Sequence, residues 1–160
     1  MTKPIPEPFR SITPHLTIKD ADKAIDFYQK IFGGQIINQM FWPNGKIMHA
    51  KVKIGDSIFM LHEETAGADK GDPAPTTIGG SPVSLHVFVD DVDATFNRAV
   101  EAGAKAVFPP TNMFWGDRWG RLVDPFGHRW DLATHVEDVA PADVEKRQKD
   151  FCNQMATVKK

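Results

Sequence analysis

Two histidines and one aspartate have the residue types that a divalent metal site requires. His15, His86 and Asp131 each lie in a short segment where apolar and polar residues alternate. Because successive side chains of a strand point to opposite faces, each of the three falls opposite the aliphatic face of its strand. Two imidazoles and a carboxylate suit Zn, Ni, Mn or Fe and leave positions open for water or substrate. We therefore predict a metal site here; the alternative is that the histidines only line a polar cleft.

These residues belong to a sequence that repeats itself. Residues 15–22 resemble residues 86–93, which lie 71 positions later, and Gly55 resembles Gly127, which lies 72 positions later. A repeat of this length predicts two related structural modules. Two such modules that face each other could direct both histidines into one shared cleft.

The repeat does not supply a fourth metal ligand. The spacing between the glycines pairs Phe59 with Asp131, and a phenyl ring cannot bind a metal, so we place Phe59 on the substrate side. Alternation puts Glu63 on the same face as Phe59 and directs His62 to the other face. His49 is predicted to point into the cleft from a neighbouring strand. We take His49 and Glu63 as the groups that could move a proton.

Hydrophobic periodicity predicts an α+β fold with the order β-α-β-β-β in each module. The expected strands are 11–18, 34–40, 47–54 and 57–62 in the first module, and 83–89, 106–113, 118–123 and 129–135 in the second. The expected helices are 20–32, begun by Asp20 or Asp22 and ended at Gly33, and 92–102. We expect one domain over 1–138, with module one at 10–63, a linker at 64–81 and module two at 82–136. Residues 139–160 are expected to form a C-terminal helix or tail.

One segment of the second module is dense in aromatic and charged residues. Trp115, Asp117, Arg118 and Trp119 lie within five positions of one another, and Phe88 is expected to share a face with His86. Tryptophan rings can stack a flat or apolar ligand while the neighbouring charges pair with it. We predict these five residues to bind substrate; the alternative is a core turn held by an Asp117–Arg118 pair.

The composition excludes several classes of protein. The 160 residues carry a net charge of −2 without a basic stripe, which argues against nucleic acid as a partner. Cys152 is the only cysteine, so neither a disulfide framework nor a thiolate metal cluster can form. No apolar segment approaches the roughly 20 residues that a membrane span needs. We expect a cytoplasmic protein.

Several motifs together resemble a known family. They are SITP at residues 11–14, AIDFY at 24–28, IGD at 54–56, GGSP at 79–82, FWGDR at 114–118 and DPFGHRW at 124–130. In these motifs the chain resembles the vicinal oxygen chelate superfamily, also called the glyoxalase/bleomycin resistance/dioxygenase fold, and its PhnB-like branch. The resemblance implies two modules that form one eight-stranded cupped mixed sheet with helices on the outer face, and commonly a homodimer.

The resemblance also implies which positions would hold a metal. Ligands in this superfamily come from the first and last strand of each module, where this chain has His15, Phe59, His86 and Asp131. The four-ligand pattern of glyoxalase I is therefore broken at Phe59. Two histidines and one acid are closer to the pattern of extradiol dioxygenases and fosfomycin-modifying transferases, with Asp131 in place of a glutamate.

Two functions follow from these expectations. The first is a metal-dependent enzyme of lyase, dioxygenase or transferase type that acts on a small molecule with adjacent oxygens. The second is a metal-free protein of the bleomycin resistance type, which holds a cationic antibiotic or another small ligand between aromatic walls formed by Trp115, Trp119 and Phe88. A protein that binds a cationic antibiotic is expected to be more acidic than a net charge of −2, so the charge of the chain favours the enzyme slightly. In either case the expected partner is a small molecule, with neither a nucleic acid nor a membrane.

Overall fold

The computed structural model describes residues 2–65 and 71–158 and contains the two predicted modules. Module one consists of β1 (His15–Ile18), α1 (Ala21–Phe32), β2 (Gln35–Phe41), β3 (Ile47–Ile54) and β4 (Ser57–Glu63). Module two consists of β5 (Ser84–Phe88), α3 (Val92–Glu101), β6 (Lys105–Asn112), β7 (Asp117–Val123) and β8 (Arg129–His135). The short helix α2 (Pro75–Ile78) precedes module two, and α4 (Pro141–Val158) follows it.

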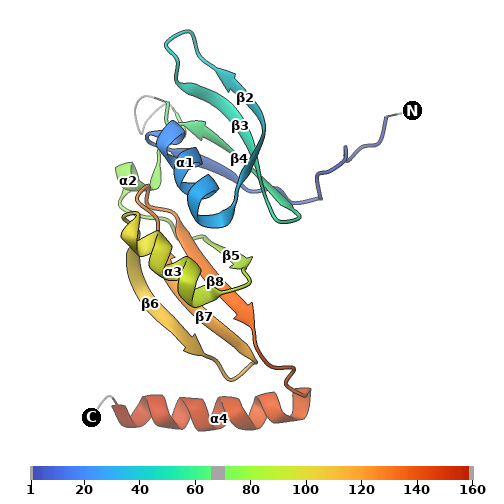
Figure 1. The fold of residues 1–160 in the computed structure, drawn as a ribbon, viewed down its shortest axis with the longest axis vertical. Helices are drawn as coiled ribbons and strands as arrows, with labels where there is room; N and C mark the ends of the chain where they lie inside the picture. The colour runs from blue at the N-terminus through green and yellow to red at the C-terminus, as the bar shows by residue number, and fades with distance from the viewer. Residues whose placement is uncertain (1, 66–70, 159–160) are drawn as a thin grey trace. The chain divides into compact units, whose positions relative to one another are not determined.

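Each module has its own four-stranded mixed sheet with the same strand order (Figure 1). The orders are β1-β4-β3-β2 and β5-β8-β7-β6. β1 runs parallel to β4, and β5 runs parallel to β8, while the other neighbouring strands are antiparallel. This confirms the predicted α+β class and the two β-α-β-β-β modules. The strands hydrogen-bond into two separate sheets, and the single eight-stranded cup stays a prediction.

Alternation along β1 decides which face of the first sheet is buried. Leu16 and Ile18 are buried, and α1 contributes Ala24, Tyr28 and further apolar residues to the same core. Gly33 ends α1 in the left-handed region, with φ of 64°, where its N–H donates to carbonyls of the last turn. His15 and Thr17 therefore lie on the opposite face of the sheet, which α1 does not cover.

The turn between β7 and β8 packs against module one. Asp124 is buried and accepts hydrogen bonds from the Tyr28 hydroxyl at 2.7 Å and from the backbone N–H groups of Phe126 and His128 at 2.9 Å each. Nε2 of His128 lies 3.1 Å from the carbonyl oxygen of Thr17. The DPFGH motif thus belongs to the first unit, where it supplies a buried carboxylate, a role that its sequence did not reveal.

Two segments lie outside the two modules. The linker expected at 64–81 falls partly outside the described residues, and its described part contains α2, a short helix that begins at Pro75. Residues 141–158 form a regular helix, α4, which is held through Phe151 and Arg147. Among the described residues, no helix is both long and apolar enough to span a membrane.

The chain divides into two compact units. One comprises Met1–Val83 with Asp124–His128, and the other comprises Ser84–Val123 with Arg129–Lys160. The first unit therefore holds module one together with the β7–β8 turn, and the second holds the sheet of module two. Candidate functional residues are described within each unit.

Candidate functional site

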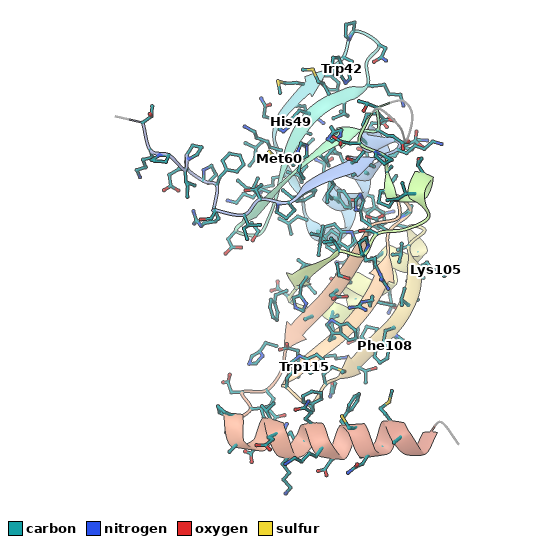
Figure 2. All side chains as sticks on the ribbon, turned by 180° about the vertical axis from the view of Figure 1, so that it is seen from behind. Trp42, His49, Met60, Lys105, Phe108 and Trp115 are labelled. Carbon is teal, nitrogen blue, oxygen red and sulfur yellow. The ribbon has the colours of Figure 1, made fainter. Side chains whose placement is uncertain are left out.

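Three histidines from three strands of module one come together on the face that α1 leaves uncovered. Nδ1 of His62 on β4 lies 3.0 Å from Nε2 of His15 on β1, and His62 Nε2 lies 3.3 Å from the Thr17 hydroxyl. The ring of His49 on β3 meets that of His15 edge-on at 5.4 Å between centroids. Figure 2 labels His49 and Met60 on this sheet. We call this surface, formed by His15, Thr17, His49, Lys51, Met60 and His62, the module-one open face.

The surroundings of His49 and His62 lower their pKa and so favour the neutral imidazole. Burial is the main cause that lowers the pKa of His49, and the neighbouring charges of His15 and Lys51 lower it further. Burial also lowers the pKa of His62, with His15 as the next cause. Nδ1 of His49 is buried and has no hydrogen-bond partner among the described residues. Such an atom is unusual in a folded protein.

Two sequence predictions about β4 are wrong, because the alternation was assigned to the wrong face. His62 was expected to point away from His15 but contacts it directly. Glu63 lies on the helix side instead, where its carboxylate accepts from the backbone N–H groups of Asp20 and Ala21 and from Lys46 Nζ at 2.9 Å. Glu63 thus caps α1, a role that the sequence analysis gave to Asp20 or Asp22, and its carboxylate is committed to that helix.

The strand register also changes the fourth position of the predicted ligand set. His15 is paired with Met60, and His86 is paired with Asp131, so Met60 and not Phe59 is the equivalent of Asp131. Phe59 is buried in the core, where its ring meets that of Tyr28 at 5.5 Å. Phe59 therefore does not share the face of His15, contrary to the prediction that it lies on the substrate side.

Module two has a corresponding open face in which the carboxylate is already paired. Arg121 donates from Nε and Nη2 to the two oxygens of Asp131 at 2.6 and 3.0 Å. The Asp131 side chain is 13% exposed and that of Arg121 is 31% exposed. Hydrogen bonding to Asp131 raises the pKa of the Arg121 guanidinium. His86 lies beside Asp131 on the neighbouring strand. Sequence reasoning did not select Arg121.

Aromatic rings surround this ion pair. The guanidinium of Arg121 lies over the Trp119 ring at 5.2 Å, and Trp119 contacts Phe108 of β6 at 5.3 Å. Phe88 is 63% exposed and meets the His86 ring at 4.9 Å. Figure 2 labels Phe108 and Trp115 on this module. We call this surface, formed by His86, Phe88, Phe108, Trp119, Arg121 and Asp131, the module-two open face.

The remaining predicted ligand-binding residues make contacts within the protein. Trp115 Nε1 donates to Asp117 at 2.9 Å, and the other oxygen of Asp117 lies 2.7 Å from His135 Nδ1. Hydrogen bonds to Asp117, and then to Asp138, raise the pKa of His135. These contacts join the β6–β7 turn to the end of β8, from which the chain leads into α4. Asp117 does not pair with Arg118, contrary to the alternative of a turn held by that pair.

Arg118 instead forms a second bidentate pair. Its Nε and Nη2 donate to the carboxylate of Asp93 on α3 at 2.5 and 2.7 Å. Its Nη1 donates to Asn112 at 3.1 Å. The guanidinium therefore joins β7 to α3 and β6, and its predicted role in ligand binding stays a prediction.

The described residues fit a divalent metal poorly. No group of three or more His, Cys, Asp or Glu side chains within them is arranged to hold an ion. Both oxygens of Asp131 accept from Arg121, and a metal at Asp131 would have to displace that guanidinium. Met60, which lies at the position equivalent to Asp131, has a thioether in place of a carboxylate. His15 and Asp131 belong to different units, so their shared metal site stays a prediction.

Comparison with known proteins shows the family. The Glyoxalase/Bleomycin resistance protein/Dioxygenase superfamily matches residues 11–132, and the chain belongs to it, as the motifs predicted. The uncharacterized protein Rv0887c of Mycobacterium tuberculosis is 40% identical over 136 residues, which are 84% of this chain and 80% of that protein.

Solved structures share the fold. TioX from Micromonospora sp. ML1 is 28% identical, with a TM-score of 0.61 over 80% of this chain and 100% of TioX. A PhnB protein from Bacillus cereus is 20% identical, with a TM-score of 0.62 over 78% of this chain and 99% of its own. These comparisons define the family, while the particular ligand must be argued from the side chains.

Proposed function

We propose that the protein binds a small, flat organic molecule on the module-two open face and needs no metal to do so. The observation that carries this proposal is the bidentate pair of Arg121 and Asp131, because it occupies the carboxylate that a metal would require. Of the two functions expected from the sequence, this favours the binding protein of bleomycin resistance type over the metal-dependent enzyme.

Electrostatics supports ligand binding without a metal at Asp131. Two unit charges 4 Å apart interact by about 4 kcal/mol at the effective dielectric near a protein surface. Arg121 would repel a divalent cation at Asp131 with roughly twice that energy, which offsets the attraction of the Asp131 carboxylate for the cation. The cation would also have to replace two charge-assisted hydrogen bonds. A neutral or aromatic ligand meets neither cost.

The aromatic side chains suggest the shape of the ligand. Phe88 is largely exposed, and the guanidinium of Arg121 already stacks on Trp119. Exposed aromatic rings gain from offset or edge-to-face contacts with another ring, worth about 0.5–1.5 kcal/mol for each pair beyond the buried area. We therefore expect planar aromatic or heteroaromatic compounds to bind more tightly than aliphatic compounds of equal size.

A fluorescence screen in the presence of EDTA tests the proposal. A planar ligand should quench tryptophan emission in a saturable way, and Trp119→Ala should weaken binding by about tenfold or more, as for an aromatic residue at the centre of an interface. Trp42→Ala serves as the matched control, since Trp42 is an exposed tryptophan of module one. Equal loss in both variants, or binding that EDTA abolishes, would contradict the proposal.

A metal-dependent enzyme is the second candidate, favoured by one observation. His86 and Asp131 are direct neighbours in register, which is the arrangement that two ligands of one metal need. If this candidate is right, loading untagged protein with Zn, Ni, Mn or Fe(II) should give about one tight ion per chain. That ion should be lost in His86→Ala and Asp131→Asn.

Two further expectations belong to the same proposal. The family resemblance suggests a homodimer, which light scattering on the purified protein would detect as twice the mass of the 17.8 kDa chain. The composition suggests a cytoplasmic location, which fractionation of the native host would test.

A further inference from the structure

The two modules have a cationic side chain at the same position of their sheets, but the residue paired with it differs. Lys51 of β3 is paired in register with Met60 of β4, and Arg121 of β7 is paired with Asp131 of β8. Lys51 and Arg121 are thus equivalent positions of the repeat. Module two supplies its cation with a carboxylate, whereas module one offers only a thioether.

The charge of Lys51 is not compensated within the described part of the chain. No carboxylate there forms an ion pair with Lys51, and its ammonium lies over the ring of Phe9 at 5.1 Å. The charge also reaches the neighbouring histidine. Burial lowers the pKa of His49 most, and the electrostatic effects of His15 and Lys51 act in the same direction. Lys51 therefore brings an unpaired positive charge to the module-one open face, where Asp72 lies 3.6 Å from His62 Nε2.

Hydrogen-bonding groups surround the same point. Both nitrogens of His62 are engaged, by the Thr17 hydroxyl and by His15 Nε2, so when the rings are neutral and His62 donates to His15, the N–H that is left for a ligand is that of His15 Nδ1. Nδ1 of His49 is buried without a partner among the described residues, so a polar group that moved next to it would gain a hydrogen bond. Met60 adds an apolar surface next to Lys51.

We propose that the module-one open face binds the carboxylate group of an organic anion beside Lys51, at the position that Asp131 occupies in module two. The ligand carboxylate would accept from the Lys51 ammonium, and Met60 would contact its hydrocarbon part. This site is formed by residues of module one and the aromatic surface by residues of module two, so either proposal can fail without the other.

Fluorine NMR with difluorocyclohexane carboxylate tests this site, because an aliphatic probe avoids the preference for flat rings proposed for module two. The neutral carboxamide of the same probe is the control for charge. We expect saturable line broadening for the carboxylate and none for the carboxamide. Lys51→Met should weaken binding by about tenfold to a hundredfold, the range for a lost hydrogen bond to a charged group. Met60→Asp should do the same, since it gives Lys51 an internal carboxylate.

Two variants serve as controls for this experiment. Lys105→Met removes one positive charge from β6 of module two, and Trp119→Ala alters the aromatic surface; both should leave carboxylate binding unchanged. Binding that survives in Lys51→Met, or equal binding of the carboxamide, would overturn the proposal. Displacement of the probe by inorganic phosphate at lower concentration than by acetate would overturn its restriction to carboxylates.

Discussion

Replacing Arg121 by methionine should destabilise the protein, because it leaves a nearly buried carboxylate without its two donors. The Asp131 side chain is 13% exposed, and its bonds to Arg121 measure 2.6 and 3.0 Å. Hydrogen bonds to a charged group contribute about 1.5–3 kcal/mol, and the partial exposure of Arg121 argues for the middle of this range. We expect Arg121→Met to lower the free energy of unfolding by about 2 kcal/mol.

Urea unfolding followed by circular dichroism measures this change directly. In a chain of this size, a loss of about 2 kcal/mol corresponds to a fall in Tm of roughly 4–8 °C. The double variant Arg121→Met/Asp131→Leu should recover most of the loss, since an apolar pair leaves no buried charge unpaired. Arg147→Met is the matched control. Arg147 forms an equally short bidentate pair with Glu137, but both side chains are exposed, so its effect should be much smaller.

Equal destabilisation by Arg121→Met and Arg147→Met would refute this reasoning. So would a double variant that is no more stable than Arg121→Met, because the cost would then come from lost packing of the arginine stem and not from the isolated carboxylate.

Three other predictions test the fold around the site. Glu63→Ala removes the acceptor for two N–H groups at the start of α1 and should cost about 1–2 kcal/mol in urea unfolding, whereas an unchanged midpoint would contradict its role as a cap. Gly116→Ala should destabilise by more than about 1 kcal/mol, since Gly116 has φ of 104° and an added Cβ would lie 2.1 Å from the Glu137 carbonyl oxygen; wild-type stability would show that this segment moves freely. The pKa of His135 is raised in the folded protein, so its protonated form stabilises the fold. This contribution is full below the unfolded pKa of roughly 6.5 and is lost as the pH rises through the folded pKa. Thermal melts of His135→Gln should accordingly show a flatter pH profile than the wild type above this value, and identical profiles would contradict the assignment.

The sequence predicted the modules well because their pattern is local. Alternation located the strands, and glycine located the end of α1, which are properties of a few neighbouring residues. The internal repeat then placed His15 and His86 at equivalent positions, and the strand register agrees with this placement.

The prediction for Phe59 was wrong because the turn between the last two strands is one residue longer in module two than in module one. Lys53 and Ile58 are paired across four residues in module one, whereas Val123 and Arg129 are paired across five in module two. Counting from the glycines therefore shifted the register by one position. Such a shift exchanges the two faces of a strand, so Phe59 took the place of Met60.

Other features of the candidate site depend on side chains that are distant in the sequence. β4 is apolar on both faces, so its pattern could not tell which face α1 covers, and Glu63 and His62 were assigned in reverse. The pairing of Arg121 with Asp131 depends on the register of β7 and β8. A count back from the DPFGH turn could have found it, since both residues lie close to that turn.

The most direct test of the central claim is the metal content of untagged protein after loading with Zn, Ni, Mn and Fe(II), compared between the wild type and Asp131→Asn. If the carboxylate of Asp131 stays hydrogen-bonded to Arg121, elemental analysis should find the same metal content in both proteins. About one ion per chain in the wild type that is absent from Asp131→Asn would contradict the account. It would show that Asp131 leaves Arg121 to bind a metal, as the metal-dependent enzyme requires.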